Sequence, residues 1–178
     1  MTSGALIGRP EAGEYDPYYE QYLSLVPDGE LLKLLEAQLS ETLAAVEGLS
    51  DEQARYRYAA GKWSVKEVLG HLADVERVLS YRAFRISRGD RTALAGFEEN
   101  DYIANANYDE RSLESVVAEL SQARAASLAF FRSVTPVMAT LRGVANDAEV
   151  TVRALPWILV GHERHHLGVL RERYLGKV

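Results

Sequence analysis

Apolar residues recur at steps of three and four positions in four long segments, and this spacing limits the fold more than any other feature of the chain. The segments span about residues 29–48, 64–89, 112–136 and 151–174. This is the periodicity of helices that bury one face, and no segment shows a convincing strand alternation. The sequence therefore predicts an all-α fold, a four-helix bundle.

Residues that begin or end helices support these boundaries. Ser64 and Glu67 form an S-x-x-E capping box, which marks the start of the second helix. Ser112 or Asp109 can cap the third helix. Pro136 should stop that helix, because proline cannot donate a backbone hydrogen bond.

The last helix should begin near Thr151 or Pro156, after a loop at residues 143–147, and run to about Tyr174. Residues 89–110 are polar and long enough to form a crossover connection between the second and third helices, with room for one short helix. Residues 1–27 are an irregular lead-in, whose tyrosines we expect to cover one end of the core. We expect residues 1–178 to form a single domain.

Composition narrows the range of functions. The formal net charge of −6 argues against nucleic acid or an anionic membrane as the main partner and favours a small molecule. The chain has no cysteine, so any metal ligands must be His, Asp or Glu. The apolar stretches are too short for a membrane span, and no secretory signal is evident, so we expect a cytoplasmic protein.

The four histidines, at 71, 162, 165 and 166, suggest a metal site. On the last helix His162 and His166 lie one turn apart on the apolar stripe, with directions about 40° apart, whereas His165 points about 100° away from His166. His71 lies at the edge of the apolar stripe of the second helix. We therefore predict one divalent ion held by His71, His162 and His166, because one cation satisfies three buried imidazoles together.

Three histidine ligands leave a coordination position open, as in catalytic zinc sites. Nickel, cobalt, manganese or iron could bind the same nitrogens. Residues 162–166 also match the H-E-x-x-H motif of zinc metalloproteases, in which Glu163 would be the general base. The chain lacks the further downstream His ligand, so we interpret Glu163 as a solvated helix-face charge. Asp74 and Glu163 are candidates to support the ligands, or ordinary surface acids.

The sequence resembles the DinB family of DinB/YfiT-like metal-dependent enzymes along its whole length. The resemblance is clearest in three segments, residues 18–22, 62–74 and 162–168. The resemblance implies a four-helix bundle with a long crossover, a homodimer, and one zinc or nickel ion on His71, His162 and His166. It also implies a thiol-dependent transferase or isomerase chemistry. Because the chain has no cysteine, a low-molecular-weight thiol would come from outside as a cosubstrate.

These observations leave three hypotheses. The first is a metal-dependent transferase or hydrolase that acts on a small molecule between the helices. The second is a non-catalytic metal-binding or stress-response protein, and the third is a metal-free bundle with buried imidazoles. Trp63 and Trp157 are expected to pack in the core or at a helix entry rather than to bind a ligand.

Overall fold

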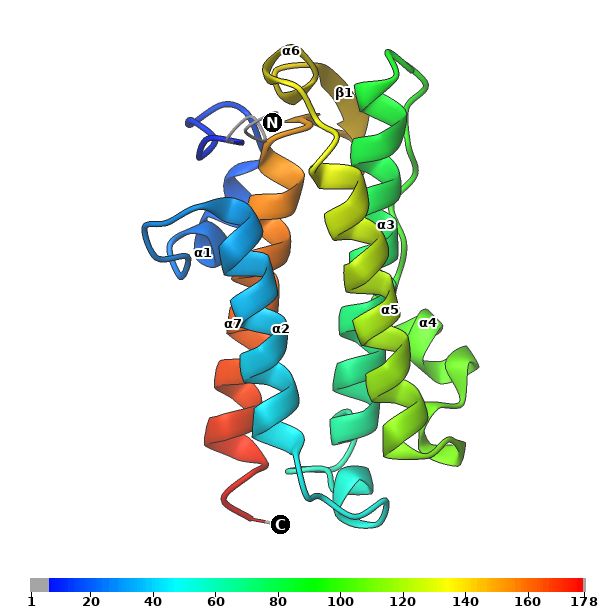
Figure 1. The fold of residues 1–178 in the computed structure, drawn as a ribbon. Coiled ribbons are helices and arrows are strands. Elements are labelled where there is room, and N and C mark those ends of the chain that lie inside the picture. The colour runs from blue at the N-terminus through cyan, green and yellow to red at the C-terminus, as the bar shows by residue number, and fades with distance from the viewer. Residues whose placement is uncertain (1–6, 178) are drawn as a thin grey trace.

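The computed structural model describes residues 7–177, so the first six residues of the predicted lead-in and Val178 lie outside the described part. Within that part four long helices form the body of the molecule (Figure 1). They are α2 (Leu31–Val46), α3 (Val65–Ser87), α5 (Leu113–Phe131) and α7 (Ala154–Arg173). The predicted all-α four-helix bundle is confirmed.

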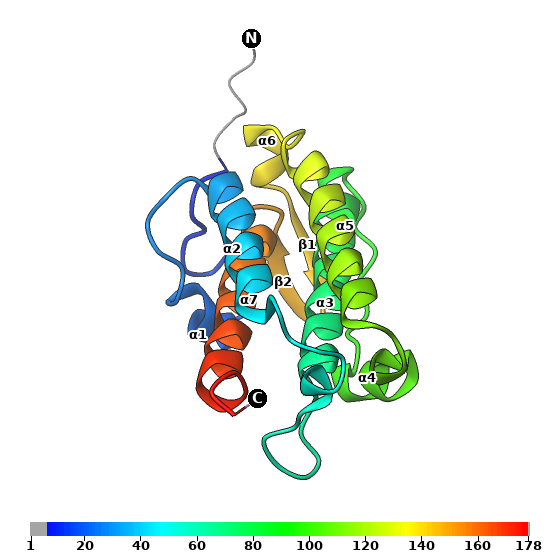
Figure 2. The ribbon, with the colours of Figure 1, turned by 60° about the horizontal axis from the view of Figure 1, so that its bottom comes forward.

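The order of the helices around the bundle does not follow the chain. Figure 1 shows α2 and α7 running in one direction and α3 and α5 in the other. Helices α2 and α3 each pack against both α5 and α7. The pair α2 and α3 therefore occupies one diagonal of the bundle and the pair α5 and α7 the other, while α3 and α5 are neighbours. Figure 2 shows the same arrangement with the lower end of the bundle turned toward the viewer. The two histidine-bearing helices, α3 and α7, are therefore antiparallel neighbours.

The parallel run of α3 and α5 explains the long crossover connection. The chain leaves the end of α3 and must travel back along the bundle before α5 can begin (Figure 1). The returning segment contains a short helix, α4 (Glu99–Ala106), which packs on α3. The predicted crossover with one short helix is confirmed.

Local hydrogen bonds fix the helix starts that the sequence predicts. The Ser64 hydroxyl accepts from the backbone N–H of Glu67 at 3.1 Å, and the Glu67 carboxylate accepts from the N–H of Ser64 at 2.7 Å. Ser112, rather than Asp109, caps α5 by accepting from the N–H of Ser115 at 3.1 Å. These side chains satisfy backbone donors that have no partner inside the helix.

The prediction of a loop after the third helix is wrong. Helix α5 ends at Phe131, and Pro136 begins a short helix, α6 (Pro136–Ala139). Two antiparallel strands follow, β1 (Arg142–Ala145) and β2 (Ala148–Thr151). Each strand has only four residues, too few for a clear alternation, but the turn at Asn146 and Asp147 has φ values of 52° and 61°, typical of a tight hairpin.

The lead-in is partly helical. A 3₁₀ turn (Pro17–Tyr19) leads into α1 (Glu20–Leu23), which packs on α7. The approach is close, because a Cβ atom added to Gly161 of α7 would lie 2.2 Å from the backbone oxygen of Tyr22. The tight contact places the tyrosines of the lead-in beside α7.

A polar layer divides the buried core into two apolar clusters. One cluster contains Leu35, Leu79 and Phe131, and the other contains Leu69 and Leu120. Buried polar side chains from all four long helices lie between the clusters: Gln38, Thr42, His71, Glu76, Arg124, His162 and Glu163. Within residues 7–177, no helix has the length and apolar character needed to cross a membrane.

Candidate metal centre

Three histidines converge in the polar layer. The Nε2 atom of His162 lies 3.1 Å from Nε2 of His71 on α3 and 3.1 Å from Nε2 of His166 one turn further along α7. The three ring nitrogens all lie within 4.8 Å of one another. His71 and His162 are buried and His166 is half-buried, whereas His165 is exposed. The structure thus groups the three histidines that the sequence predicts and leaves the fourth outside.

The spacing of the nitrogens fits a shared divalent ion. Two nitrogens that are each about 2.0–2.1 Å from one ion, at octahedral or tetrahedral angles, lie about 2.8–3.4 Å apart. The two distances of 3.1 Å fall inside this range. Imidazole nitrogens suit zinc and nickel, and three of them leave further positions of the ion free.

Burial keeps the imidazoles in the form that binds metals. Loss of hydration lowers the pKa of His71 to about 4. It lowers the pKa of His166 to about 3, with a further contribution from the charges of His71 and His165. The pKa of His162, which is the most enclosed, is lowered well below its ordinary value by the same causes. A neutral ring has a free lone pair, which is what a metal ion requires.

Aromatic rings hold the histidines in place. The ring of Trp63 lies 4.7 Å from that of His71 and is nearly parallel to that of His166, at 6.3 Å. Tyr22 packs edge-on against His162 at 5.3 Å. Trp63 directly precedes the cap of α3, as predicted for a helix-entry residue, but its ring also forms a wall of the centre.

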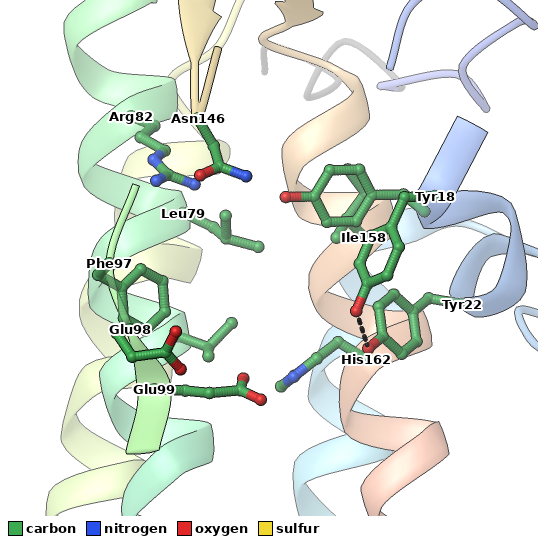
Figure 3. Close-up of a pocket in the computed structure, with 12 residues that line it drawn as sticks. Tyr18, Tyr22, Leu79, Arg82, Phe97, Glu98, Glu99, Asn146, Ile158 and His162 are labelled. Carbon is green, nitrogen blue, oxygen red and sulfur yellow. Dashed lines mark hydrogen bonds between the residues drawn. The ribbon is translucent and has the colours of Figure 1, made fainter. Parts of the chain in front are cut away.

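A cavity of about 320 Å³ opens beside His162 (Figure 3). Tyr18, Tyr19 and Tyr22 of the lead-in line it. Tyr15 and Tyr19 also pack against one of the two apolar clusters, in keeping with the expectation that the lead-in covers part of the core. The other lining residues come from α3, the crossover, the hairpin turn and α7: Val75, Leu79, Arg82, Phe97, Glu98, Glu99, Asn146, Ile158 and His162. A second cavity, of about 290 Å³, is lined by His165, His166 and Trp63 among others. The centre therefore has open space on two sides.

Glu99 is a candidate functional residue that the sequence does not single out. Its Oε2 lies 3.7 Å from Nε2 of His71, at the edge of the larger cavity. Partial burial, together with the neighbouring charge of Glu98, raises the pKa of Glu99. The acidic pair at the start of α4 is visible in the sequence, but no helical periodicity relates it to the histidines.

The interpretation of Glu163 as a solvated charge is wrong. Its side chain is only 2% exposed, and its two oxygens accept from the Thr42 hydroxyl and from Arg124, each at 2.7 Å. Arg124 also pairs with Glu76 at 2.8 Å. The face of α7 that carries Glu163 is covered because α2 packs there. A carboxylate with these partners is not free to act as the general base of an H-E-x-x-H protease.

Asp74 does not support a histidine ligand either. Its carboxylate accepts from the hydroxyl of Tyr108 at 2.9 Å. Among the hydrogen bonds of residues 7–177, neither Asp74 nor Glu163 has a histidine as partner. Partial burial raises the pKa of Asp74, so it is not an ordinary surface acid.

A sequence model of the DinB superfamily matches residues 34–170, which include all three converging histidines. The chain belongs to the DinB superfamily. One relative, from Geobacillus thermodenitrificans (strain NG80-2), is named "Putative metal-dependent hydrolase". It is 40% identical over 70 residues, a match that covers 39% of this chain and only 38% of the relative.

Another relative covers most of the chain. "Putative metal-dependent hydrolase YfiT" of Bacillus subtilis (strain 168) is 24% identical over 163 residues, 90% of each protein. The solved structure of YfiT from Bacillus subtilis, described as having an unusual four-helix bundle topology, matches with a TM-score of 0.73 at 20% identity. That match covers 95% of this chain and 94% of the other, and it confirms the DinB/YfiT-like fold.

Proposed function

We propose that this DinB-superfamily chain is a metal-dependent enzyme with a mononuclear centre on His71, His162 and His166. The observation that carries the proposal is the convergence of three neutral imidazoles beside a cavity large enough for a small molecule. A zinc or nickel ion bound there supplies a Lewis acid, which polarises an electrophile or acidifies a water or thiol.

The protein groups around the centre divide the remaining tasks. His71, His162 and His166 provide three lone pairs from two rigid helices, so the donor geometry is set before any ligand binds. Trp63 and Tyr22 shield the imidazoles from bulk water. Glu99 lies on the cavity side, where its Oε2 is placed to accept a proton from a substrate group next to His71.

The reaction we propose is group transfer to a low-molecular-weight thiol, or hydrolysis of a small molecule. Two cavities that reach the histidines from different sides support the transfer reaction, because it needs room for two reactants. The absence of cysteine supports an external thiol, since the chain has none of its own. The names of the relatives support hydrolysis.

The alternatives have less support. A non-catalytic metal-binding protein needs no cavity at the centre, and a cavity of about 320 Å³ is lined by His162. A metalloprotease of the H-E-x-x-H class needs a free glutamate, and Glu163 is held by Arg124 and Thr42.

The test is elemental analysis of untagged protein, purified without chelator, beside three single variants. His71→Ala and His166→Ala each remove one proposed ligand, while His165→Ala removes a neighbouring exposed imidazole and is the matched control. We expect close to one zinc or nickel per chain in the wild type and in His165→Ala, and a large loss in the other two. Protein that binds no metal even when zinc, nickel, manganese or iron is added would contradict the proposal.

A further inference from the structure

Arg82 is a buried cation without an acidic partner. Its residue is 4% exposed, and among residues 7–177 no carboxylate lies within 4.0 Å of its guanidinium. Its one hydrogen bond at normal distance runs from Nη2 to the backbone oxygen of Ala95 at 2.8 Å. Burial lowers the pKa of Arg82, which reflects the unfavourable loss of hydration. Buried guanidinium groups are ordinarily paired with an anion, so this one has capacity for a partner.

Helical geometry places Arg82 on the same face of α3 as the metal centre. Arg82 follows His71 by 11 positions, which brings the two side-chain directions within about 20° of each other. The two Cα atoms are separated by about 16 Å along the helix. Side chains on a helix lean toward its N-terminus, so the guanidinium leans toward His71. Val75 and Leu79 lie between them and form an apolar wall of the cavity.

The cavity therefore has two chemically different ends. Figure 3 shows Arg82 beside Asn146 at one end and His162 with Glu99 at the other. The hairpin turn presents Asn146, and its side-chain oxygen packs closely against Gly96. A Cβ atom added to Gly96 would lie only 2.1 Å from that oxygen. The Tyr19 hydroxyl adds a further hydrogen-bonding group near Arg82. One end can bind an anion, and the other holds the proposed reaction centre.

We propose that Arg82 binds the carboxylate of the small-molecule substrate, with the apolar body of the substrate against Val75 and Leu79 and its reactive group at the histidines. This inference rests on the proposed function, because it assigns the second end of the same cavity. A guanidinium matches a carboxylate in charge and in its forked geometry. A dianionic phosphate ester would exceed the single positive charge and would face Glu98 and Glu99 across the cavity.

The experiment measures binding of paired probes by calorimetry. The probes are phenylacetate, 3-phenylpropionate and 4-phenylbutyrate, each compared with its neutral amide, which has the same apolar body. A carboxylate can also bind a metal ion, so each titration is made with metal-loaded and with metal-stripped protein. We expect at least one acid to bind about 10-fold to 100-fold more tightly than its amide in both forms, as a charge-assisted hydrogen bond requires.

Variants assign that preference to one residue. Arg82→Met should abolish the preference for the acid, and Arg82→Lys should keep part of it, because lysine retains the charge but not the fork. Arg88→Met is the matched control, since Arg88 directly follows the end of the same helix with its guanidinium over Phe84, outside the cavity. Circular dichroism checks that each variant is folded, and Arg82→Lys carries the test if Arg82→Met is not.

Each outcome decides the proposal. The proposal is overturned if Arg82→Met prefers the acid over the amide as strongly as the wild type does. It is also overturned if the wild type binds each acid no more tightly than its amide. A preference seen only with metal-loaded protein also overturns it, because the carboxylate is then a metal ligand. If an Arg82-dependent preference occurs in a protein that binds no metal, the anion site stands and the proposed metal-dependent function fails.

Discussion

Gly161 is a residue at which the lead-in packs tightly against the last helix. Gly161→Ala would push the added Cβ into the backbone of Tyr22, so we expect the free energy of unfolding to fall by about 1–3 kcal/mol. A Cβ atom added to Gly168 on the same helix has no neighbour within 4 Å, so Gly168→Ala should raise the free energy of unfolding by up to about 1 kcal/mol. Urea titration of both variants gives the comparison, and equal effects would contradict the close contact.

The histidines predict how the stability of the metal-free protein depends on pH. In the unfolded chain they bind protons below about pH 6.5, but in the folded chain His71 does so only near pH 4 and His166 near pH 3. Between pH 6.5 and 4 the unfolded state holds more protons, so the free energy of unfolding falls as pH falls. Each histidine contributes up to about 1.4 kcal/mol per pH unit.

Urea titrations with chelator present, at several values in this pH range, measure that slope. His71→Gln removes a titrating ring and should make the slope shallower. His165→Ala, which removes an exposed ring outside the converging group, is the control and should change the slope less than His71→Gln does. A slope that is the same in His71→Gln and in the wild type would contradict the assignment.

At the scale of single residues, the sequence predicts where side chains lie on one helix better than it predicts contacts between different helices. The i, i+4 spacing of His162 and His166 places both toward the bundle interior, and the structure confirms their meeting with His71. Glu163 is predicted wrongly, because periodicity on one helix does not show that a second neighbour covers its other face. Glu99 is missed for a related reason: the crossover, whose path no local pattern determines, carries it to His71.

Among the elements, α5 carries a buried positive charge that bonds to each of the other three long helices. Arg124 pairs with Glu76 of α3 and Glu163 of α7 and donates to the backbone oxygen of Leu35 of α2 at 2.6 Å. Burial alone would lower the pKa of Arg124, but the two carboxylates raise it above its ordinary value. One guanidinium thus links all four long helices through the polar layer.

Removal of this guanidinium should therefore strongly lower the free energy of unfolding. Arg124→Met leaves two buried carboxylates without their partner, and we expect the free energy of unfolding to fall by about 3–5 kcal/mol. The control is Arg132→Met after the end of the same helix, where an exposed pair with Glu36 should contribute less than about 1 kcal/mol. Thermal and urea unfolding measure both, and a loss in Arg124→Met as small as in the control would contradict a joining role.

Elements with strong local signals are the ones that the sequence predicts. The capping box sets the start of α3 to the residue, and apolar spacing gives all four long helices. The hairpin β1–β2 is missed because its short strands carry little alternation. The diagonal placement of α2 opposite α3 and of α5 opposite α7 also lies beyond local patterns, since it depends on which helix faces fit together.

For the whole molecule, the resemblance to the DinB family predicts a homodimer, which remains a prediction. Tyr81 and Phe84 of α3 expose 52% and 43% of their surfaces, and Phe84 packs against Phe130 of α5. An apolar face of this kind can form a contact between copies. Sedimentation equilibrium should give twice the chain mass for the wild type and the monomer mass for Phe84→Glu. A monomeric wild type would contradict the prediction.

The wide separation of the proposed ligands along the chain determines when the centre can form. His71 and His162 are 91 positions apart, and the crossover, α5 and the hairpin all lie between them in the chain. During synthesis His71 therefore emerges long before its partners. The complete three-histidine set that we propose for a metal ion exists only after the last helix has docked. An ion bound at the proposed centre would therefore join the fold late. It would slow unfolding of the completed molecule and leave the rate of folding largely unchanged.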